Sequence, residues 1–263
     1  MNIPKPEHPN PQWERENWIN LNGEWEFEFD FSKSARERKL YAGGALARRI
    51  TVPFCPESCL SGIGYTDFIP SVCYRKSIIL KEEDLENNVF LHFGAVDFHS
   101  YIYINGVLAD EHIGGYSSFK VDITALVKPG ENTIFVIAED DVRGGKQPAG
   151  KQSTRHESYG CLYTRTTGIW QTVWLEFVPK SYVKSCKYYP DIKNRTLTVT
   201  GEVVGSGVLE LTSSYEGRVT GSVRADVNGG FFSVQIALSE LYLWEVGCGR
   251  LYDLLISFGG DVV

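Results

Sequence analysis

The side chains best placed to contact a ligand are the basic residues of the segment 141–165. This segment holds Arg143, Lys146, Lys151, Arg155 and Arg165 against two acids, inside a chain whose formal net charge is −7. A connection of this length between strands is uncommon in compact domains and is often functional. Two interpretations stay open. The charges contact a ligand directly, or the segment faces another domain or a partner, where its charges are solvated or paired.

Aromatic residues offer a second kind of contact, because the apolar face of a pyranose ring can lie flat on an aromatic ring. In a β-sandwich, however, an aromatic residue at alternating positions is more often part of the core. We therefore predict that Trp25 and Trp174 are buried, and the same interpretation is favoured for Trp170. The candidates for a sugar-stacking platform are Tyr65, Tyr116, Tyr163 and Trp170.

Common catalytic patterns are absent from the sequence. It contains no Gly-x-Ser-x-Gly elbow, no phosphate-binding Gly-rich loop ending in Lys-Ser/Thr and no His-Glu-x-x-His pair. We interpret His92 and His99 as satisfied structural residues beside a tight turn, and Asp97 as a turn former rather than an acid. The residues by themselves predict a binding or scaffolding chain.

The cysteines predict neither a disulfide scaffold nor a zinc site. Only Cys55 and Cys59 lie close together, and no two histidines stand at metal-ligand spacing. Reduced thiols, no metal and no cofactor are therefore expected. The six cysteines are Cys55, Cys59, Cys73, Cys161, Cys186 and Cys248.

The charge balance argues against nucleic acid and membrane partners. The chain has 26 Lys and Arg against 33 Asp and Glu, so a general attraction to anionic surfaces is not expected. No apolar run approaches the roughly 20 residues that cross a bilayer, and the first residues lack the apolar stretch of a signal peptide. We expect a cytoplasmic protein, or a periplasmic or secreted one if a signal peptide has been removed.

Apolar alternation predicts many short strands. Trp25, Phe27 and Phe29 alternate with glutamates, which is typical of a half-buried strand. Asn105-Gly106 predicts a type I′ hairpin turn between two apolar runs. Short helices are expected at 34–40 and 82–88, and 238–244 is ambiguous. Further strands are expected at 89–93, 101–104, 107–109, 134–138 and 169–177.

The absence of strand-helix alternation excludes doubly wound folds and (β/α)₈ barrels, so the predicted class is all-β. A boundary is expected near 178–180, where a Trp-rich part gives way to short strands at regular spacing. Residues 1–180 suit a jelly-roll β-sandwich, and residues 181–263 a smaller immunoglobulin-like β-sandwich. The strands expected in the second domain are 181–187, 195–204, 207–213, 217–225, 231–237 and 251–258.

The segment 165–176, which reads RTTGIWQTVWLE, resembles the N-terminal region of glycoside hydrolase family 2, the group of β-galactosidases, β-glucuronidases and β-mannosidases. The resemblance covers residues 13–178 and is weaker from 181 onward, where Leu251-Tyr252-Asp253-Leu254 carries it. Supporting matches lie at 20–25, 52–54, 74–76, 94–97, 105–106, 114–116, 119, 122–124 and 130–132.

This resemblance implies a modular glycosidase with a sugar-binding jelly roll, an immunoglobulin-like domain and a (β/α)₈ barrel that holds two catalytic glutamates. The family's acid/base lies in an Asn-Glu dipeptide, and the sequence contains none. The chain also stops before the family's usual last strand of the second domain. We therefore expect a truncated piece or gene fragment that is inactive alone. The implied partners are the barrel of the same full-length chain, a carbohydrate and, in a homo-oligomer, further copies of the chain.

The resemblance also assigns candidate substrate-binding residues. In β-galactosidases of the family an Asn follows Tyr-Thr and reaches the sugar, and here Asp67 follows Tyr65-Thr66. Those enzymes place an Asp three residues before the Arg of the Gly-Ile motif, where this chain has Leu162. The segment 143–152 looks like the loop near the barrel mouth. The candidates are Asp67, Arg143, Lys146, Gln147, Lys151, Gln152, Tyr163 and Arg165.

The functional expectation is a non-catalytic N-terminal part of a retaining β-glycosidase, most similar to β-galactosidases, which supports the barrel and shapes its substrate pocket. Two alternatives stay open. One is a free-standing carbohydrate-binding module, and the other is a structural or adhesion β-sandwich with no sugar site.

Overall fold

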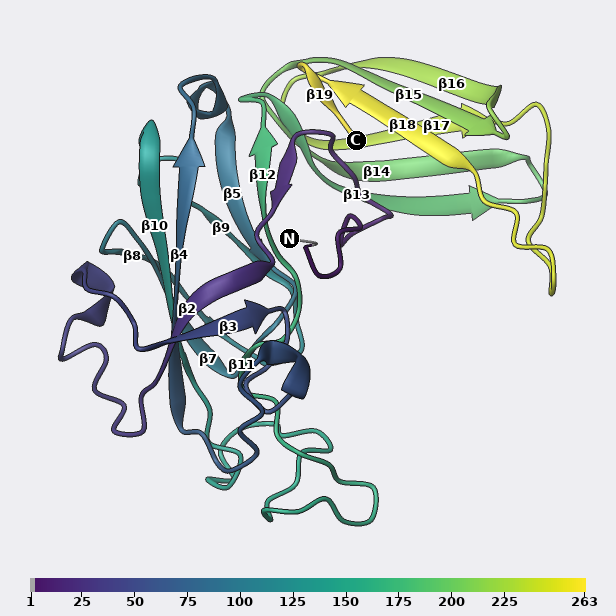
Figure 1. The fold of residues 1–263 in the computed structure, drawn as a ribbon. Coiled ribbons are helices and arrows are strands. Elements are labelled where there is room, and N and C mark those ends of the chain that lie inside the picture. The colour runs from purple at the N-terminus through teal and green to yellow at the C-terminus, as the bar shows by residue number, and fades with distance from the viewer. Residues whose placement is uncertain (1–2) are drawn as a thin grey trace. The chain divides into compact units, whose positions relative to one another are not determined.

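The structure, a computed structural model that describes residues 3–263, is built almost entirely of β-strands, which confirms the predicted fold class (Figure 1). The chain folds into two compact units. The first covers residues 3–11 and 16–177, and the second covers 12–15 and 178–263. No sequence pattern indicates that residues 12–15 join the second unit. They do so because Arg15, 6% exposed, donates two hydrogen bonds of 2.7 and 2.9 Å to the Asp261 carboxylate. No helix among residues 3–263 has the length and apolar character needed to cross a membrane.

The first unit consists mainly of two sheets. One has four strands in the order β1-β12-β5-β9, and the other has six in the order β3-β2-β4-β10-β7-β8, with a small β11-β6 ladder beside them. The pairs β4/β10, β10/β7 and β2/β4 are antiparallel. The strand bounds are β1 Trp18–Asn20, β2 Gly23–Phe29, β3 Arg48–Val52, β4 Ser71–Leu80, β5 Asn88–Phe93, β6 Val96–Asp97, β7 His99–Ile104, β8 Val107–Ile113, β9 Phe119–Asp122, β10 Gly130–Glu139, β11 Gly168–Ile169 and β12 Val173–Val178.

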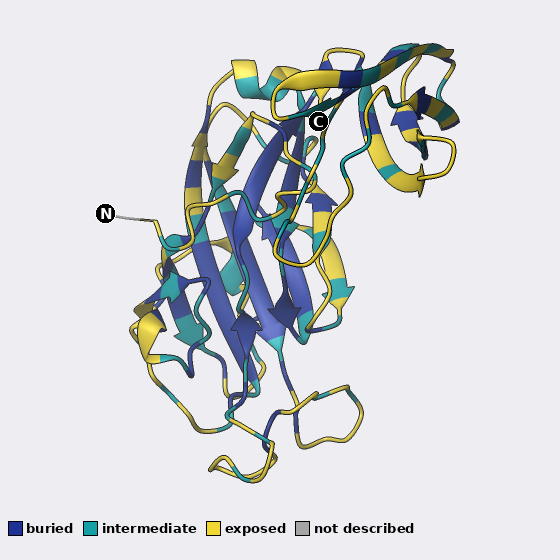
Figure 2. Cartoon of the chain, turned by 90° about the vertical axis from the view of Figure 1, so that its right-hand side faces the viewer, coloured by how far each residue is buried: buried dark blue, intermediate teal, exposed yellow. Residues whose placement is uncertain are grey.

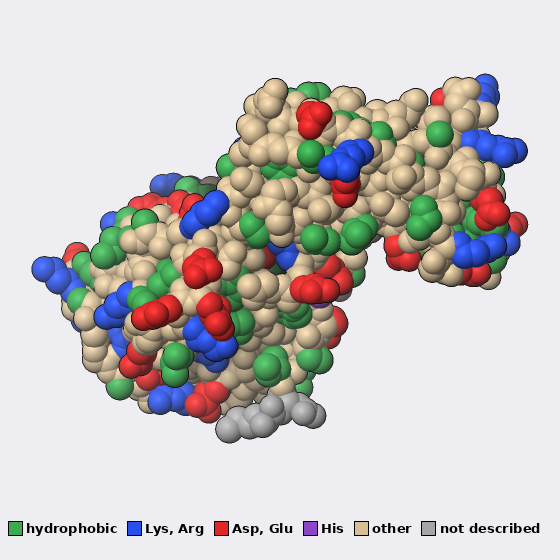
Figure 3. Space-filling view, turned by 90° about the horizontal axis from the view of Figure 1, so that it is seen from above, with side chains coloured by type: hydrophobic (Ala, Val, Ile, Leu, Met, Phe, Trp, Pro, Cys, Tyr) green, Lys and Arg blue, Asp and Glu red, His purple; other side chains and the backbone are tan. Residues whose placement is uncertain are grey.

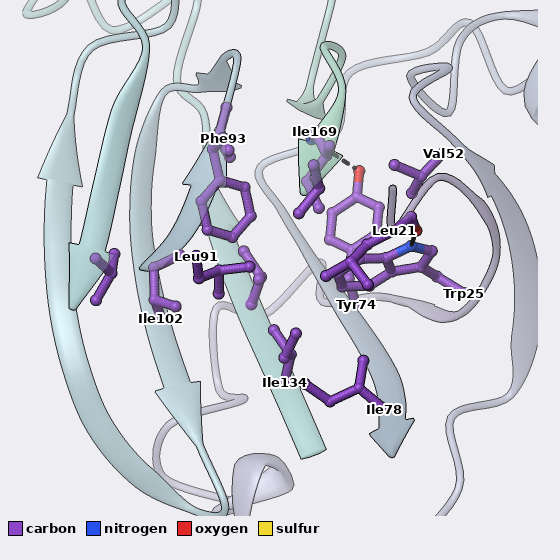
Figure 4. Close-up of a cluster of buried hydrophobic side chains, with 14 of the residues drawn as sticks. Leu21, Trp25, Val52, Tyr74, Ile78, Leu91, Phe93, Ile102, Ile134 and Ile169 are labelled. Atoms are coloured by element: carbon purple, nitrogen blue, oxygen red, sulfur yellow. Dashed lines mark hydrogen bonds between the residues drawn. The ribbon is translucent and has the colours of Figure 1, made fainter. Parts of the chain in front are cut away.

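The core of the first unit is a cluster of apolar residues from these sheets, and Figure 2 shows how much of these strands is buried. Trp25 and Trp174 are 1% and 6% exposed, which confirms their predicted burial. Two polar groups of this core are paired (Figure 4): the Trp25 indole N–H donates to the Leu21 carbonyl at 2.8 Å, and the Tyr74 hydroxyl accepts from the Ile169 N–H at 3.2 Å. Such pairing offsets the cost of burying polar groups.

The short helices predicted from the sequence were wrong. The structure has only 3₁₀ turns near two of them, η1 (Leu40–Ala42) and η3 (Glu83–Glu86), besides η2 (Cys59–Ser61), and 238–244 is not helical. The Asp30 carboxylate accepts hydrogen bonds from the backbone N–H groups of Ser34 and Ala35. Such side-chain bonds compete with helix formation, and a segment this short does not nucleate a stable helix.

The predicted strand at 169–177 is two strands. The chain leaves the β11-β6 ladder after Ile169 and enters the four-stranded sheet at Val173. The Gly94 N–H donates to the Thr172 carbonyl at 2.9 Å, which holds the crossing segment against the end of β5. A run of apolar residues therefore marks burial here rather than one continuous ladder.

The second unit is a smaller sandwich of a three-stranded sheet, β13-β14-β17, and a four-stranded sheet, β16-β15-β18-β19. Its core includes Val183, Val199, Leu211, Ile256 and Phe258. The expectation that its last strand is missing stays a prediction. The strand bounds are β13 Tyr182–Asp191, β14 Thr196–Val204, β15 Gly207–Tyr215, β16 Arg218–Val227, β17 Gly230–Ala237, β18 Asp253–Phe258 and β19 Asp261–Val262.

Candidate functional site

The segment 141–165, called here the basic loop, connects β10 to β11 at one end of the first unit, at the bottom of Figure 1. It forms no named strand. Its regular contacts are isolated bridges, one between Gln152 and Tyr163 and one between Tyr159 and Leu162. Its course is held by backbone hydrogen bonds, such as that from the Ser153 N–H to the Tyr163 carbonyl at 2.6 Å, and by side-chain contacts. Two of its side chains reach one group of acids.

Three carboxylates, Glu57, Asp97 and Asp140, form a buried carboxylate cluster beneath the basic loop, at exposures of 6%, 0% and 4%. Asp97 ends β6, Asp140 directly follows β10, and Glu57 lies between β3 and η2. Gly115 makes room for the cluster, because a Cβ at this position would lie 2.1 Å from the Asp97 Oδ1. Within residues 3–263, Asp97 Oδ1 and Glu57 Oε1 have no hydrogen-bond partner.

Burial controls the protonation of this cluster. Removal from water raises the pKa of Glu57 to about 7 and the pKa of Asp140 to about 6. It also raises the pKa of Asp97 to about 7, with a further contribution from the negative charge of Asp140. Desolvation disfavours the charged form of a carboxylate, which explains the common direction. These acids therefore titrate between about pH 6 and pH 7 and are not fully ionised near neutral pH.

Two amide side chains of the basic loop donate to the cluster. The Gln147 Nε2 donates to the Asp140 Oδ1 at 2.5 Å, and the Gln152 Nε2 donates to the Asp97 Oδ2 at 2.8 Å. The Gln152 Oε1 accepts from the Thr166 N–H at 2.7 Å, which closes the end of the loop. Both glutamines, predicted as substrate-binding residues, thus hold the loop to the body of the unit.

Arg165 is a second buried anchor, at 2% exposure. Its guanidinium donates to the carbonyls of Thr66, Ser153 and Arg155, so it joins the segment at Thr66 to the basic loop and ties two parts of the loop together. The guanidinium also lies 4.3 Å from the centre of the Phe68 ring, and that of Arg143 lies 3.9 Å from the same ring. These cation–π contacts place both arginines beside Phe68, the residue next to the candidate Asp67.

The other predicted site residues are exposed. Asp67, Lys146, Lys151 and Tyr163 all face solvent, and Tyr163 is 56% exposed. The Asp67 Oδ1 lies 3.1 Å from the His156 Nδ1, so this carboxylate is placed beside the basic loop. Of the eight candidates, Gln152 and Arg165 are therefore buried and Gln147 is half-buried. The other five form an exposed rim of carboxylate, ammonium, guanidinium and phenol groups. Such groups can donate and accept hydrogen bonds with sugar hydroxyls.

The aromatic candidates also separate. The Trp170 indole N–H donates to the Gly115 carbonyl at 2.8 Å, and the Trp170 ring meets the Tyr116 ring edge to face at 5.8 Å. The Tyr116 hydroxyl donates to the Ala149 carbonyl at 3.3 Å and accepts from Gln152 at 3.1 Å. These two rings support the loop. Tyr65 instead packs against Phe29 and Phe31.

The sequence interpretation of Asp97 as a turn former was wrong, because this residue lies in a strand and is fully buried. Glu57 and Asp140 were not singled out either. The sequence signal for these two acids is weak, because it consists only of an acid next to an apolar run. The interpretation of His92 as a satisfied structural residue was right, since its Nε2 lies 3.0 Å from the Glu176 Oε2.

No group of three or more His, Cys, Asp or Glu residues within 3–263 has the arrangement needed to hold a metal ion. The cysteines of the chain are free thiols. Burial raises the pKa of the Cys55 thiol to about 12, so this cysteine is a poor nucleophile.

Comparison with known proteins identifies the family. Residues 62–144 match the family described as "Glycosyl hydrolases family 2, sugar binding domain". A β-glucuronidase of Sus scrofa is 31% identical over 269 residues, covering 90% of this chain and 41% of that protein. A β-galactosidase of Thermoanaerobacter pseudethanolicus is 28% identical over 194 residues, covering 70% of this chain and 25% of that protein.

Solved structures agree on the fold. A β-glucuronidase from Ruminococcus gnavus superimposes with a TM-score of 0.75 at 21% identity, covering 95% of this chain and 45% of that one. A β-glucuronidase from Lactobacillus rhamnosus gives a TM-score of 0.74 at 22% identity, covering 91% of this chain and 41% of that one. The chain thus spans less than half the length of each of these four proteins.

Proposed function

The chain belongs to glycoside hydrolase family 2, and we propose that it is the non-catalytic part of a β-glycosidase, which supports a catalytic barrel and contributes the basic loop to the saccharide pocket. The observation that carries this proposal is the combination of buried anchors and an exposed polar rim on the basic loop. A loop held by Gln147, Gln152 and Arg165 can keep Asp67, Lys146 and Lys151 at defined positions for a ligand. Rigid support of this kind favours binding because less freedom is lost when a ligand arrives.

The buried acids of the chain are not suited to catalyse retaining hydrolysis, so we place the catalytic groups in the barrel. Retaining hydrolysis needs two carboxyl groups about 5–5.5 Å apart that flank the glycosidic bond. Glu57, Asp97 and Asp140 are at most 6% exposed, so they cannot contact a saccharide in this conformation. Asp67, by contrast, is exposed and pairs with His156. We assign the buried acids a structural role and Asp67 a binding role.

For the sugar we place β-glucuronides before β-galactosides. Lys146 and Lys151 are both exposed on a loop that is net positive, and a uronate carboxylate would be attracted to them. Leu162 stands where the galactosidases of the family place an acid. A leucine side chain cannot hydrogen-bond a sugar hydroxyl, and it does not repel a carboxylate. The assay described below measures hydrolysis of both the glucuronide and the galactoside.

The experiment compares this chain with the whole protein to which it belongs. The chain alone is expected to hydrolyse neither 4-nitrophenyl β-glucuronide nor the β-galactoside, whereas the whole protein should hydrolyse the glucuronide. In the whole protein, the double variant Lys146→Ala, Lys151→Ala should raise KM about three- to tenfold with a smaller change in kcat, since it removes ground-state contacts. The matched control is Lys128→Ala, an exposed lysine outside the loop. Turnover by the chain alone, or an unchanged KM in the double variant, would contradict the proposal.

A further inference from the structure

The first unit also has a hollow whose lining lies outside the basic loop. It is a cleft of about 670 Å³ between residues 5–11 and the strands β5, β9 and β12. Its lining includes Lys5, His8, His92, Lys120 and Trp174, and it shares no residue with the basic loop. The volume lies in the range of small-molecule sites, about 300–1,000 Å³. Neither the basic loop nor the buried carboxylate cluster accounts for this cleft.

The strand side of the cleft is held in place by stacked rings. The His92 imidazole lies parallel to the Trp174 indole, with ring centres 4.7 Å apart and an angle of 14° between the planes. The His92 Nε2 is at 3.0 Å from the Glu176 Oε2. This contact on one ring nitrogen and stacking on one ring face fix the orientation of the imidazole. A fixed imidazole presents its remaining edge to the cleft at little entropic cost.

The next part of the lining, Gln171 and Thr172, is also positioned. The Gln171 side chain packs on Gly94 so closely that a Cβ on that glycine would lie 2.6 Å from the Gln171 Cβ. The Thr172 Oγ1 accepts from the Asn22 Nδ2 at 3.2 Å. An amide and a hydroxyl are the groups that protein sites use to hydrogen-bond sugar hydroxyls.

The opposite side of the cleft, residues 5–11, is tied to the same body. The Asn22 Nδ2 donates to the Pro4 carbonyl at 3.0 Å, and the Asn20 Nδ2 donates to the Lys5 carbonyl at 2.9 Å. The His8 ring meets the Trp18 ring edge to face at 4.7 Å. Both sides of the cleft are therefore formed before any ligand binds.

The charge of the cleft is opposite to that of the chain. The charged residues of its lining are two lysines, Lys5 and Lys120, and one acid, Glu7. The Lys120 Nζ lies 4.6 Å from the centre of the Phe90 ring, which keeps the ammonium at the end of β9 beside the cleft. In a chain with a net charge of −7, a cationic cleft selects an anionic ligand.

We infer that this cleft binds a saccharide that carries a carboxylate, that is, a uronic acid residue within a short glycan. The lysines receive the carboxylate, and the amide, hydroxyl and imidazole groups receive the hydroxyls. This inference does not rest on the proposed function of the basic loop, because the two sites have no residue in common.

The test is calorimetric titration of this chain at low salt with trigalacturonate, using maltotriose as the neutral reference. We expect trigalacturonate to bind with a millimolar or tighter Kd and maltotriose at least tenfold more weakly. Lys120→Glu should weaken trigalacturonate binding about tenfold or more, while Lys128→Glu, which makes the same change of net charge outside the cleft, should stay within twofold of the parent chain. Lys120→Gln, which removes the charge without reversing it, should give an intermediate loss.

Four outcomes would overturn the inference. They are no binding of trigalacturonate at millimolar concentration, equal binding of the neutral trisaccharide, an equal loss in Lys128→Glu, and a loss in the double variant Lys146→Ala, Lys151→Ala. The last outcome would move the uronate to the basic loop and would support the proposed function at the expense of this inference. Unchanged near-ultraviolet circular dichroism of each variant checks that the fold is retained.

Discussion

Two long connections, one in each unit, are held in opposite ways. The basic loop of the first unit is anchored by buried polar groups, with Gln152 and Arg165 at 4% and 2% exposure. The segment 238–252 of the second unit, between β17 and β18, is instead held by aromatic rings near the surface. There the Tyr215 and Tyr242 rings stack at 4.2 Å, and the Tyr242 N–H donates to the Tyr252 hydroxyl at 2.6 Å.

The exposed groups of the two connections differ as well. The basic loop presents charged and phenolic groups to solvent, whereas the segment 238–252 presents Trp244 at 65%, Val246 at 92% and Leu251 at 80% exposure. Acidic and basic side chains are interspersed over the face of the molecule seen in Figure 3. The comparison teaches that long loops become defined sites where buried polar partners specify their course, because an unpaired buried group is costly.

The largest effect is expected from Arg165→Ala. Loss of this buried cation leaves the carbonyls of Thr66 and Arg155 without their donor and removes the contact with Phe68. We expect the first unit to lose about 3–5 kcal/mol of unfolding free energy, measured by urea denaturation. The matched variant in the second unit is Arg250→Ala, whose side chain is 31% exposed, and it should leave the unfolding midpoint nearly unchanged. Equal losses in the two variants would remove the contrast between the loops.

The second effect is a pH dependence that Asp97→Asn should reduce. Because burial raises the pKa of Asp97 to about 7 from its usual 3.8, the native state binds more protons than the unfolded state between these values. The unfolding free energy of the first unit should therefore be highest near pH 4, fall as pH rises to about 7, and then level off. The full contribution of this one group is up to about 4 kcal/mol.

The comparison of Asp97→Asn with the parent chain isolates this contribution. The amide cannot ionise, so the variant should gain stability relative to the parent as the pH rises from 5 to 8. Glu57 and Asp140, whose pKa values are raised to about 7 and about 6, still titrate and leave a weaker dependence in the variant. Parallel stability curves for the two proteins over this range would show that Asp97 is ionised in the native state.

A smaller effect is expected from Gly115→Ala. The added methyl group would lie 2.1 Å from the Asp97 Oδ1, so the carboxylate must shift and its hydrogen bond with Gln152 must lengthen. Overpacking of this kind costs about 1–3 kcal/mol. Gly217→Ala in the second unit is not a fair control, because that glycine has a φ of +76°. Gly207→Ala is better, since its Cβ would meet only a Phe258 atom at 3.8 Å. A cost in Gly207→Ala as large as in Gly115→Ala would argue against a tightly filled cluster.

The smallest effect on global stability is expected from Tyr242→Ala. The stacked pair with Tyr215 is lost, and the segment 238–252 should become more sensitive to limited proteolysis. The unfolding midpoint of the second unit should barely move, because its core lies between the sheets at Val199, Leu211 and Ile256. A large shift of that midpoint would mean that the exposed rings belong to the core after all.

The sequence predicted the strands better than the site. Burial and local geometry depend on residues that are neighbours in the sequence. They are visible in the alternation of Trp25, Phe27 and Phe29 and in the Asn105-Gly106 turn. Glu57, Asp97 and Asp140 come together from three separated segments, and no local pattern encodes that meeting. The basic loop was found because charge is visible in the sequence. Which of its residues are buried, such as Gln152 and Arg165, depends on tertiary contacts that spacing does not reveal.

The most direct test of the central claim, that buried polar groups hold the basic loop in place, is hydrogen exchange of backbone amides in the two connections at pH 6. The N–H groups of Ser153, Tyr163 and Thr166 donate to carbonyl or amide oxygens of the loop at 2.6–2.9 Å. We predict that these amides exchange at least about tenfold more slowly than those of the exposed residues 243–247. Equal exchange rates in the two segments would contradict the account.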